Sequence, residues 1–123
     1  MSHWVPDLED LQDALASQGY VARDWGLLGG ALARPLTTVM GEEVYPTLWL
    51  KAAALLDSIE RNHPFFDGNK RVGAILTALV LTANGVPVRV DDDDAWYDLI
   101  LDVAAGHLEV PEIAERIQAI SER

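Results

Sequence analysis

The chain has 123 residues, no cysteine and a formal net charge of −11 at pH 7. This length suits a single domain, residues 1–123, and the lack of thiols excludes disulfides and thiolate metal sites, which favours a cytoplasmic protein. The acidic balance argues against direct binding of nucleic acid or of an anionic membrane surface. Neither a signal peptide nor a membrane-spanning run is predicted.

Two helices are expected in the first third of the chain. Residues 7–18 carry leucines at three- and four-residue spacing and end at Gly19, a pattern typical of an amphipathic helix. Residues 24–34 predict a shorter helix, with Asp24 as its N-cap and Pro35 as its stop, since proline cannot continue a helix.

A short extended segment separates these helices from a third. Residues 36–45 contain β-branched side chains and the sequence Gly-Glu-Glu, so they predict a loop or small hairpin. Residues 46–61 predict a helix with one apolar face and with Pro46 in its first turn, where the missing amide hydrogen would have no partner in any case.

The longest apolar run, residues 72–84, predicts the centre of the fold. It has no charged residue and no polar face, and a helix that is apolar all round is expected inside a bundle. Asn84 and Gly85 predict a left-handed end, and Pro87 prevents the helix from resuming.

Residues 91–105 and 111–121 predict the last two helices. The first begins at the aspartates Asp91–Asp94 and closes at Gly106; the aspartates are expected to be a solvated N-cap cluster rather than a calcium site, because no ligand-loop spacing follows. The predicted fold class is all-α, a single-domain bundle of about six helices around a buried central helix, with a small extended flap. The expected core or interface anchors are Trp25, Trp49 and Trp96.

Residues 63–71, which read His-Pro-Phe-Phe-Asp-Gly-Asn-Lys-Arg, predict an anion site just before the apolar run. Gly68 gives a turn its backbone freedom, and Asp67 and Asn69 are typical helix-starting residues. The loop therefore reaches the positive N-terminal end of a helix, where free amides favour an anion such as phosphate.

Charged and titratable groups surround this predicted helix start. Lys70 and Arg71 add two cations, and His63 adds a group able to move protons near neutral pH. His63 could also be a hydrogen-bonded structural histidine and Asp67 a simple turn residue, but an anion site beside a proton acceptor indicates phosphoryl transfer. Phe65 is expected to pin the loop to the core.

The nine residues match the pattern His-x-Phe-x-Asp-Gly/Ala-Asn-Lys-Arg at every fixed position. This pattern resembles the signature of the Fic/Doc superfamily, and specifically that of the Doc (death-on-curing) toxins of type II toxin–antitoxin systems. Residues 23–35 and 45–56 also resemble segments of that family, and the length is similar to that of a whole Doc-type protein.

The resemblance implies a Fic/Doc helical bundle with a defined set of site residues. His63 would act as general base on a protein hydroxyl, and Asp67 would bind Mg²⁺ together with the nucleotide ATP. The catalytic set would be His63, Asp67, Lys70 and Arg71, and the nucleotide-binding set Gly68, Asn69, Lys70 and Arg71. The family's flap, which aligns the target peptide by main-chain pairing, would comprise Thr37, Thr38, Val39, Met40 and Gly41.

Two positions of the motif bear on which group is transferred. Fic enzymes that transfer AMP resemble His-x-Phe-x-Asp/Glu-Gly-Asn-Gly-Arg-x-x-Arg, whereas this chain has Lys70 for the second glycine and Ala74 for the second arginine. Both departures resemble Doc, in which the γ-phosphate of ATP is transferred. The resemblance therefore implies a kinase-like toxin that acts on a threonine of elongation factor Tu and inhibits translation. The alternatives are an AMP-transferase and, second, a non-catalytic Doc-like binding module.

Control of such an enzyme is expected to come from a partner. Fic proteins that restrain themselves carry a Ser/Thr-x-x-x-Glu-Gly/Asn helix, and the nearest match, Thr38 with Glu42, lies in the flap region and is discounted. The resemblance therefore implies a Phd-like antitoxin. A helical segment of it would cover an apolar groove on the first or last helices, which Trp4 or Trp96 would mark.

Overall fold

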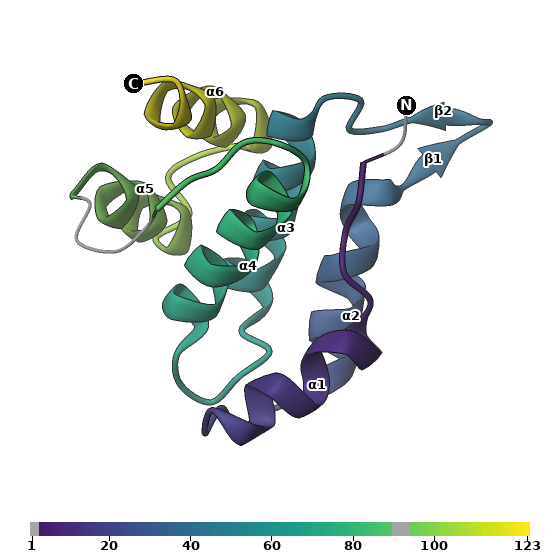
Figure 1. Cartoon of the computed structure of the whole chain (residues 1–123), viewed down its shortest axis with the longest axis vertical. Helices are drawn as coiled ribbons and strands as arrows, with labels where there is room; N and C mark the ends of the chain where they lie inside the picture. The colour runs from purple at the N-terminus through teal and green to yellow at the C-terminus, as the bar shows by residue number, and fades with distance from the viewer. Residues whose placement is uncertain (1–2, 90–93) are drawn as a thin grey trace.

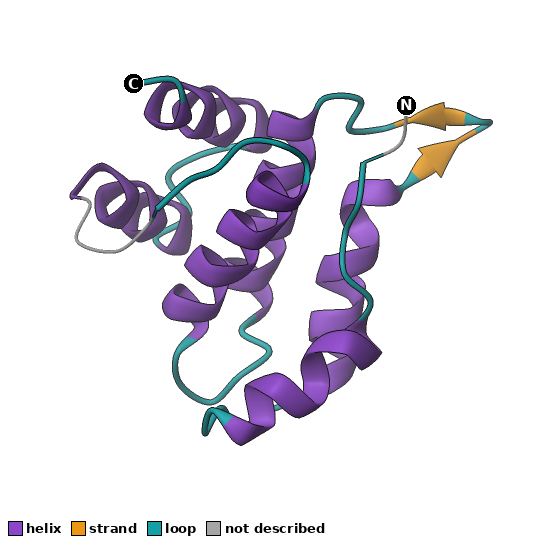
Figure 2. Ribbon diagram, in the orientation of Figure 1, coloured by secondary structure: helices purple, strands orange, loops and turns teal. Residues whose placement is uncertain are grey.

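The structure, a computed structural model, describes residues 3–89 and 94–123 (Figure 1). Helices dominate the described chain, and a two-stranded hairpin is the exception (Figure 2). In chain order the elements are α1 (Leu8–Ser17), α2 (Trp25–Ala33), the 3₁₀ turn η1 (Arg34–Leu36), β1 (Thr38–Val39), β2 (Glu42–Glu43), α3 (Leu48–Asn62), α4 (Asn69–Ala83), α5 (Asp94–Ala104) and α6 (Val110–Ser121). The predicted all-α class with a small extended segment is confirmed.

Helix α3 occupies the centre of the bundle. Each of residues 51–60 is buried, and α3 packs against α2, α4, α5 and α6. The prediction that residues 72–84 form the central helix is wrong, because α4 leaves Ile75 and Leu79 exposed, by 43% and 36%. Apolar side chains are common on protein surfaces, so an apolar run does not require burial on every side.

Polar side chains of α3 can be buried because several of them are paired inside the bundle. The Asp57 carboxylate lies 2.8 Å from Arg34 Nη1 and 2.8 Å from Arg61 Nε. Burying a charge costs much less when the charge is paired and hydrogen-bonded than when it is left without a partner. A helix with charged residues can therefore be more central than one without any.

The core has two parts that share α3 and α4. One part gathers around Phe65 and includes residues of α1 and α2; the other gathers around Trp96 and includes residues of α5 and α6. Trp96 is 1% exposed, so its expected role as a core anchor is confirmed and its expected role as a marker of an exposed groove is wrong. Trp25 and Trp49 are partly buried against the first and second parts respectively.

Helix α2 begins and ends as predicted, to within one residue. Asp24 is its N-cap, and Asp24 Oδ1 accepts a hydrogen bond from the Gly26 amide at 2.8 Å. The α-helix ends at Ala33, before Pro35, and the chain then continues as the 3₁₀ turn Arg34–Leu36, which the sequence did not predict. The ring of Pro35 fits the start of this tighter turn, where no amide hydrogen is needed.

Helix α3 begins two residues later than expected. Thr47 is its N-cap, and Thr47 Oγ1 accepts from the Leu50 amide at 3.1 Å. Pro46 therefore lies before the helix and not in its first turn. A hydroxyl that satisfies a first-turn amide is a stronger start signal than a proline that only tolerates the position.

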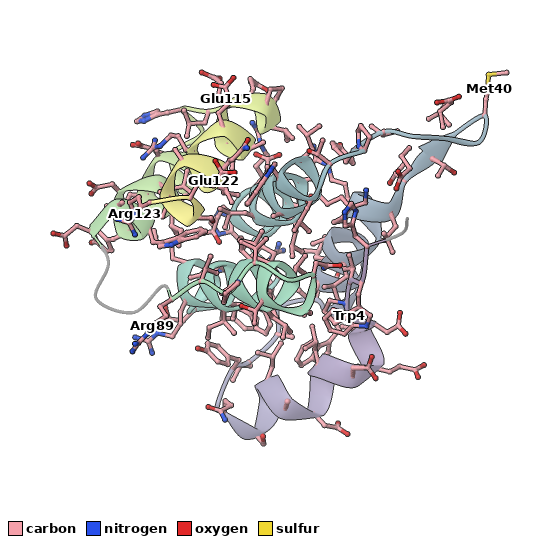
Figure 3. The ribbon with its side chains drawn as sticks, turned by 45° about the horizontal axis from the view of Figure 1, so that its top comes forward. Trp4, Met40, Arg89, Glu115, Glu122 and Arg123 are labelled. Carbon is pink, nitrogen blue, oxygen red and sulfur yellow. The ribbon has the colours of Figure 1, made fainter. Side chains whose placement is uncertain are left out.

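The predicted hairpin forms between η1 and α3. Strands β1 and β2 are antiparallel, with Thr38 opposite Glu43. Met40 and Gly41 connect them with φ angles of 53° and 80°, as in a type I′ turn. Met40 is 97% exposed and points away from the body of the molecule (Figure 3).

Lys51 anchors the stem of this hairpin to α3. Its side chain is fully buried, and its Nζ donates to the Tyr45 carbonyl at 2.6 Å and lies 2.9 Å from Glu43 Oε1. The hydrogen bond from Lys51, and then its charge, hold the pKa of the Glu43 carboxyl below its usual range. Arg34 Nε donates to the Tyr45 hydroxyl at 2.9 Å. The stem is therefore fixed, while the tip reaches into solvent.

The predicted fifth and sixth helices are α5 and α6. Helix α5 is described from Asp94 onward, so the predicted cluster at Asp91–Asp93 lies outside the described residues. Helix α6 begins with a capping box, in which the Glu109 amide donates to Glu112 Oε1 at 3.0 Å. Within residues 3–89 and 94–123, no helix has the length and apolar character needed to cross a membrane.

Replacing Lys51 with methionine tests the anchor. Lys51→Met keeps an unbranched side chain of similar length but leaves the Tyr45 carbonyl without its donor, so the free energy of unfolding should fall by about 1–3 kcal/mol. Urea denaturation at neutral pH measures the loss. Glu43→Gln is the matched control: it keeps the Tyr45 acceptor and replaces the carboxylate oxygen by an amide oxygen, so Lys51 Nζ retains its hydrogen-bond acceptors and a clearly smaller loss is expected. Equal losses in the two variants would contradict a buried anchor.

Candidate active site

The motif loop connects α3 to α4 and has left-handed backbone at both ends (Figure 1). His63 follows α3 with φ 49° and donates its amide to the Ile59 carbonyl at 3.1 Å. Gly68 has φ 87° and is the N-cap of α4. A Cβ at position 68 would also lie 2.7 Å from Tyr20 Cε1. Glycine meets both the conformational and the steric constraint.

Phe65 pins the loop to the core, as predicted. Its side chain is 1% exposed, and its ring meets those of Tyr20 and Trp25 edge to face, with centroids 5.8 and 5.5 Å apart. The next residue, Phe66, donates its amide to the Val21 carbonyl at 3.2 Å. The segment before α2 therefore holds both the ring and the backbone of the loop.

Asn69 and Arg23 fix the two sides of the loop. The Asn69 side chain accepts from the Phe65 amide at 3.0 Å and donates to the Phe65 carbonyl at 2.9 Å, and its Nδ2 lies 3.5 Å from His63 Nδ1. Arg23 donates to the carbonyls of His63 and Asn62, at 2.9 and 2.6 Å. The amide side chain of Asn69 thus shapes the loop, and Arg23 is a supporting residue that the motif itself does not predict.

The free amides at this helix start are those of residues 69–71. Gly68 donates its own amide to Asp67 Oδ1 at 2.9 Å, so this group is already paired, as expected for a turn aspartate. Val72 makes the first amide bond of α4, to the Gly68 carbonyl at 2.9 Å. The three preceding amides have no acceptor within the helix, and no side chain caps it. An anion at this end of α4 would meet these amides first.

Four of the predicted side chains are exposed around this helix start: His63, Asp67, Lys70 and Arg71. In the described part of the chain, neither Lys70 nor Arg71 forms a salt bridge. Two cations at the positive end of a helix each cost a few tenths of a kcal/mol, roughly, until an anion offsets them. The motif residues therefore form one exposed surface with an electrostatic preference for an anion.

The predicted flap does not lie beside His63. The hairpin precedes α3 and His63 follows it, and a helix of 15 residues separates its ends by about 20 Å. Figure 1 shows the hairpin and the motif loop at opposite ends of α3. The flap residues 37–41 are all exposed. The hairpin is therefore an accessible element at a distance from the motif and not a wall of its site.

A polar pocket of about 490 Å³ borders the C-terminal half of α3. It is lined by Arg34, Asp57, Ser58, Arg61, Asn62, Glu109, Val110 and Pro111. None of these residues belongs to the motif at 63–71, and both arginines are already paired with the Asp57 carboxylate. Among the described residues, the pocket thus reaches the motif only through Asn62, which directly precedes His63 in the chain.

Glu60 is a buried carboxyl near the motif that the motif does not predict. It is 1% exposed, and neither of its oxygens has a hydrogen-bond partner within the described residues. Burial raises the pKa of Glu60 to about 8, against the opposing charge of Lys70. One signal in the sequence is its position four residues after Leu56, which places an acidic residue on the buried face of α3.

Comparison with known proteins agrees with this geometry. The model of the Fic/DOC family matches residues 5–81, a range that includes the whole motif loop. The chain is also 46% identical over 96 residues to the protein named Toxin Doc of Mycolicibacterium smegmatis (strain ATCC 700084 / mc(2)155), an alignment that covers 77% of this chain and 74% of the relative. The chain therefore belongs to the Fic/Doc family, as its motif indicates.

Gly68→Ala tests the steric constraint on the loop, with Gly85→Ala as the matched control. Both glycines have positive φ, 87° and 93°, but a Cβ at position 85 would meet nothing within 4 Å. A left-handed alanine costs about 1–2 kcal/mol. Gly85→Ala should lose that much unfolding free energy in urea denaturation, and Gly68→Ala clearly more, because the Tyr20 ring must move. Equal losses would show that Tyr20 yields without cost.

The pH dependence of stability tests the state of Glu60. Because its pKa is raised in the folded chain, the folded state keeps a proton that the unfolded state releases above about pH 4.5. The stability of the wild type should therefore fall relative to that of Glu60→Gln between about pH 5 and pH 8, by at most about 1.4 kcal/mol per pH unit, and the difference should level off above pH 8. Chemical denaturation at a series of pH values measures it.

Glu43→Gln is the control of opposite sign. The pKa of Glu43 is lowered, so its contribution to stability is lost only as the pH falls below about 4.5. The difference between Glu43→Gln and the wild type should stay constant at higher pH. A constant difference for Glu60→Gln between about pH 5 and pH 9 would show that burial does not keep Glu60 protonated.

Proposed function

We propose that this chain is the toxin of a toxin–antitoxin pair and transfers the γ-phosphate of ATP to a hydroxyl of a protein. The relative that it matches is named Toxin Doc, and Fic/Doc membership suggests a transferase. The start of α4 is the observation that carries the proposal, because uncapped amides, two cations and His63 share one exposed surface there. Such a surface suits a phosphate beside a proton acceptor.

In this proposal His63 is the general base. Arg23 and Asn69 hold the backbone on either side of it, so the imidazole is presented to solvent at a fixed place. The acceptor hydroxyl gives its proton to the neutral imidazole while its oxygen bonds to the γ-phosphorus. The bond from that phosphorus to the bridging oxygen breaks, and ADP leaves with the electron pair.

The phosphates would be held by the first turn of α4. The amides of residues 69–71 would donate to phosphate oxygens, and Lys70 and Arg71 would counter the charge that develops during transfer. Asp67 would hold Mg²⁺, which when bound neutralises phosphate charge. No group of three His, Asp or Glu residues in the described chain could hold a metal alone, so the nucleotide would supply ligands as well.

The identity of two residues favours transfer of the γ-phosphate over transfer of AMP. Lys70 stands where AMP-transferring Fic enzymes have a glycine, and its side chain occupies space that a close approach of the α-phosphate would need. Ala74 stands at the position of their second arginine and packs against the part of the core that contains Trp96. This face of α4 therefore has no second arginine to clamp a phosphate.

The protein substrate would be elongation factor Tu, phosphorylated at a threonine, which would inhibit translation. The hairpin is the proposed docking element, because both of its strands are exposed and a two-stranded ribbon has open outer edges for main-chain pairing. Since the ends of α3 lie about 20 Å apart, the hairpin would hold the body of the target while another segment presents the threonine to His63.

A Phd-like antitoxin would cover an apolar surface along α4 and the segment before α1. Ile75 and Leu79 lie one turn apart and are exposed by 43% and 36%, and Trp4 is exposed by 47%. Trp4 is labelled in Figure 3. Asn84 fastens Trp4 to the end of α4, since it accepts from the Trp4 amide and donates to the Trp4 carbonyl, both at 2.8 Å. An amphipathic helix of the antitoxin would fit such a row of apolar side chains.

Transfer of label from ATP tests the proposed activity. Purified elongation factor Tu is incubated with ATP labelled at the γ or the α position and with wild type, His63→Ala or His107→Ala. Label is expected from the γ position only, with a loss on the order of 100-fold or more in His63→Ala, because the general base is removed. His107, an exposed histidine between α5 and α6, is the matched control and should leave transfer unchanged.

The other outcomes separate the alternatives. Label from the α position would establish an AMP-transferase in spite of Lys70 and Ala74. Bound nucleotide without any transfer would point to a different target or to a binding module, and transfer that survives in His63→Ala would remove His63 from the chemistry.

A further inference from the structure

A buried carboxyl lies directly behind the proposed nucleotide site. Glu60 belongs to the last turn of α3, three residues before His63, and its carboxylate packs against Gly73 of α4. Lys70 lies three residues before Gly73, hence on the same face of α4. Its charge is the one that acts on Glu60. The carboxyl therefore lies at the crossing of the two helices, and the charge of the motif lysine acts on it there.

The position of Glu60 is built into the crossing of α3 and α4. A Cβ at position 73 would overlap the Glu60 carboxylate and lie 2.9 Å from Leu56 Cδ1, so glycine leaves this side chain in place whereas a larger residue would force both neighbours to shift. Neither carboxylate oxygen has a hydrogen-bond partner in the described residues. An unpaired buried carboxyl of this kind prefers to hold a proton, and burial raises its pKa to about 8.

The other charged groups around α3 are directed elsewhere. Helix α2 has no titratable side chain, and Arg34 of η1 and Arg61 of α3 both bind Asp57. In α6 Arg116 binds Asp102 of α5, and Asp94 and Asp98 of α5 are exposed. Arg71 and His63 are exposed beside the loop. Lys51 of α3 donates to the Tyr45 carbonyl and lies beside Glu43. Among the described cations, Lys70 is the one whose charge acts on Glu60.

We propose that Glu60 is a positioning residue that competes with bound phosphate for Lys70. With a proton on Glu60, Lys70 is free to reach a phosphate at the start of α4. When Glu60 loses that proton, the buried negative charge draws the ammonium inward and also repels the phosphate. Proton binding at Glu60 and nucleotide binding therefore strengthen each other, and by linkage the effect is reciprocal. This inference rests on the proposed nucleotide site.

The pairing of Glu60 with Lys70 is tested first without nucleotide. The carbon-13 shift of the Glu60 side-chain carboxyl, assigned by its loss in Glu60→Gln, is followed against pH in the wild type, Lys70→Met and Arg71→Met. The midpoint should lie near pH 8 in the wild type and move upward by about half a unit or more in Lys70→Met, because a stabilising cation is removed. Arg71→Met, which removes the neighbouring cation, is the matched control and should leave the titration midpoint of Glu60 unchanged. An unchanged midpoint in Lys70→Met would overturn the proposal.

The competition is tested next with ADP and Mg²⁺, by calorimetry near pH 7 and near pH 9. The dissociation constant of the wild type should rise by up to about tenfold, the ratio of the protonated fractions of a group that titrates near pH 8. Glu60→Gln, which stays neutral, should bind almost equally at both values. This readout differs from a loss of folding, which would weaken binding at both pH values alike.

The possible failures are distinguishable. If the wild type and Glu60→Gln both bind ADP and weaken in parallel as the pH rises, Glu60 does not control Lys70 and the inference fails while the proposed function stands. If neither protein binds nucleotide at either pH, the proposed function fails and the inference fails with it.

Discussion

Burial of α3 is the constraint on which the rest of the structure depends. Ten consecutive residues of this helix are buried. The polar side chains among them depend on a neighbouring element for a charged partner, a hydrogen-bond acceptor or the space that they occupy. Asp57 forms an ion pair with Arg34 of η1, and Lys51 donates a hydrogen bond to the Tyr45 carbonyl in the hairpin stem. The Glu60 carboxylate packs against Gly73 of α4, where a larger residue would meet it. The elements around α3 are thus positioned by specific polar demands as well as by apolar packing.

The candidate site, at the C-terminal end of α3, contains two kinds of residue: some shape the loop and others are exposed to a ligand. Phe65, Asn69 and Arg23 are occupied with the core and the backbone, and they give the loop its shape from within the protein. The side chains of His63, Lys70 and Arg71 are exposed and are not packed into the core. A loop shaped without help from a ligand loses little conformational freedom on binding, which is the condition for accurate placement of reacting groups.

Much of this architecture was predictable from local patterns. The order of the helices, the cap at Asp24, the hairpin turn and the buried ring of Phe65 all follow from spacing, capping and turn chemistry that act over a few residues. The central position of α3 was not predictable, because it depends on partners outside the helix, such as Arg34 for Asp57 and the Tyr45 carbonyl for Lys51. By the number of apolar residues alone, α4 would be expected to be more buried than α3. Because the charged residues of α3 are paired, α3 is in fact the more buried helix.

The supporting residues of the site escaped prediction for a related reason. Arg23 contacts the motif through carbonyls about 40 residues away, and its role has no local signature. The distance between the hairpin and the motif could not be predicted from either segment, since it depends on the length and direction of α3. The motif identifies the chemical groups of the site. The tertiary contacts determine which of these groups hold the loop in place and which remain exposed to a ligand.

The fit between Glu60 and Gly73 also limits how this chain can evolve. A Cβ added at position 73 would meet the Glu60 carboxylate and Leu56, so an alanine there requires both side chains to shift. Loss of the Glu60 carboxylate removes one of these two contacts and itself meets no steric barrier. The effects of substitutions at the two positions are therefore coupled. A descendant that fills the helix crossing more tightly does so more easily after it has lost its buried acid.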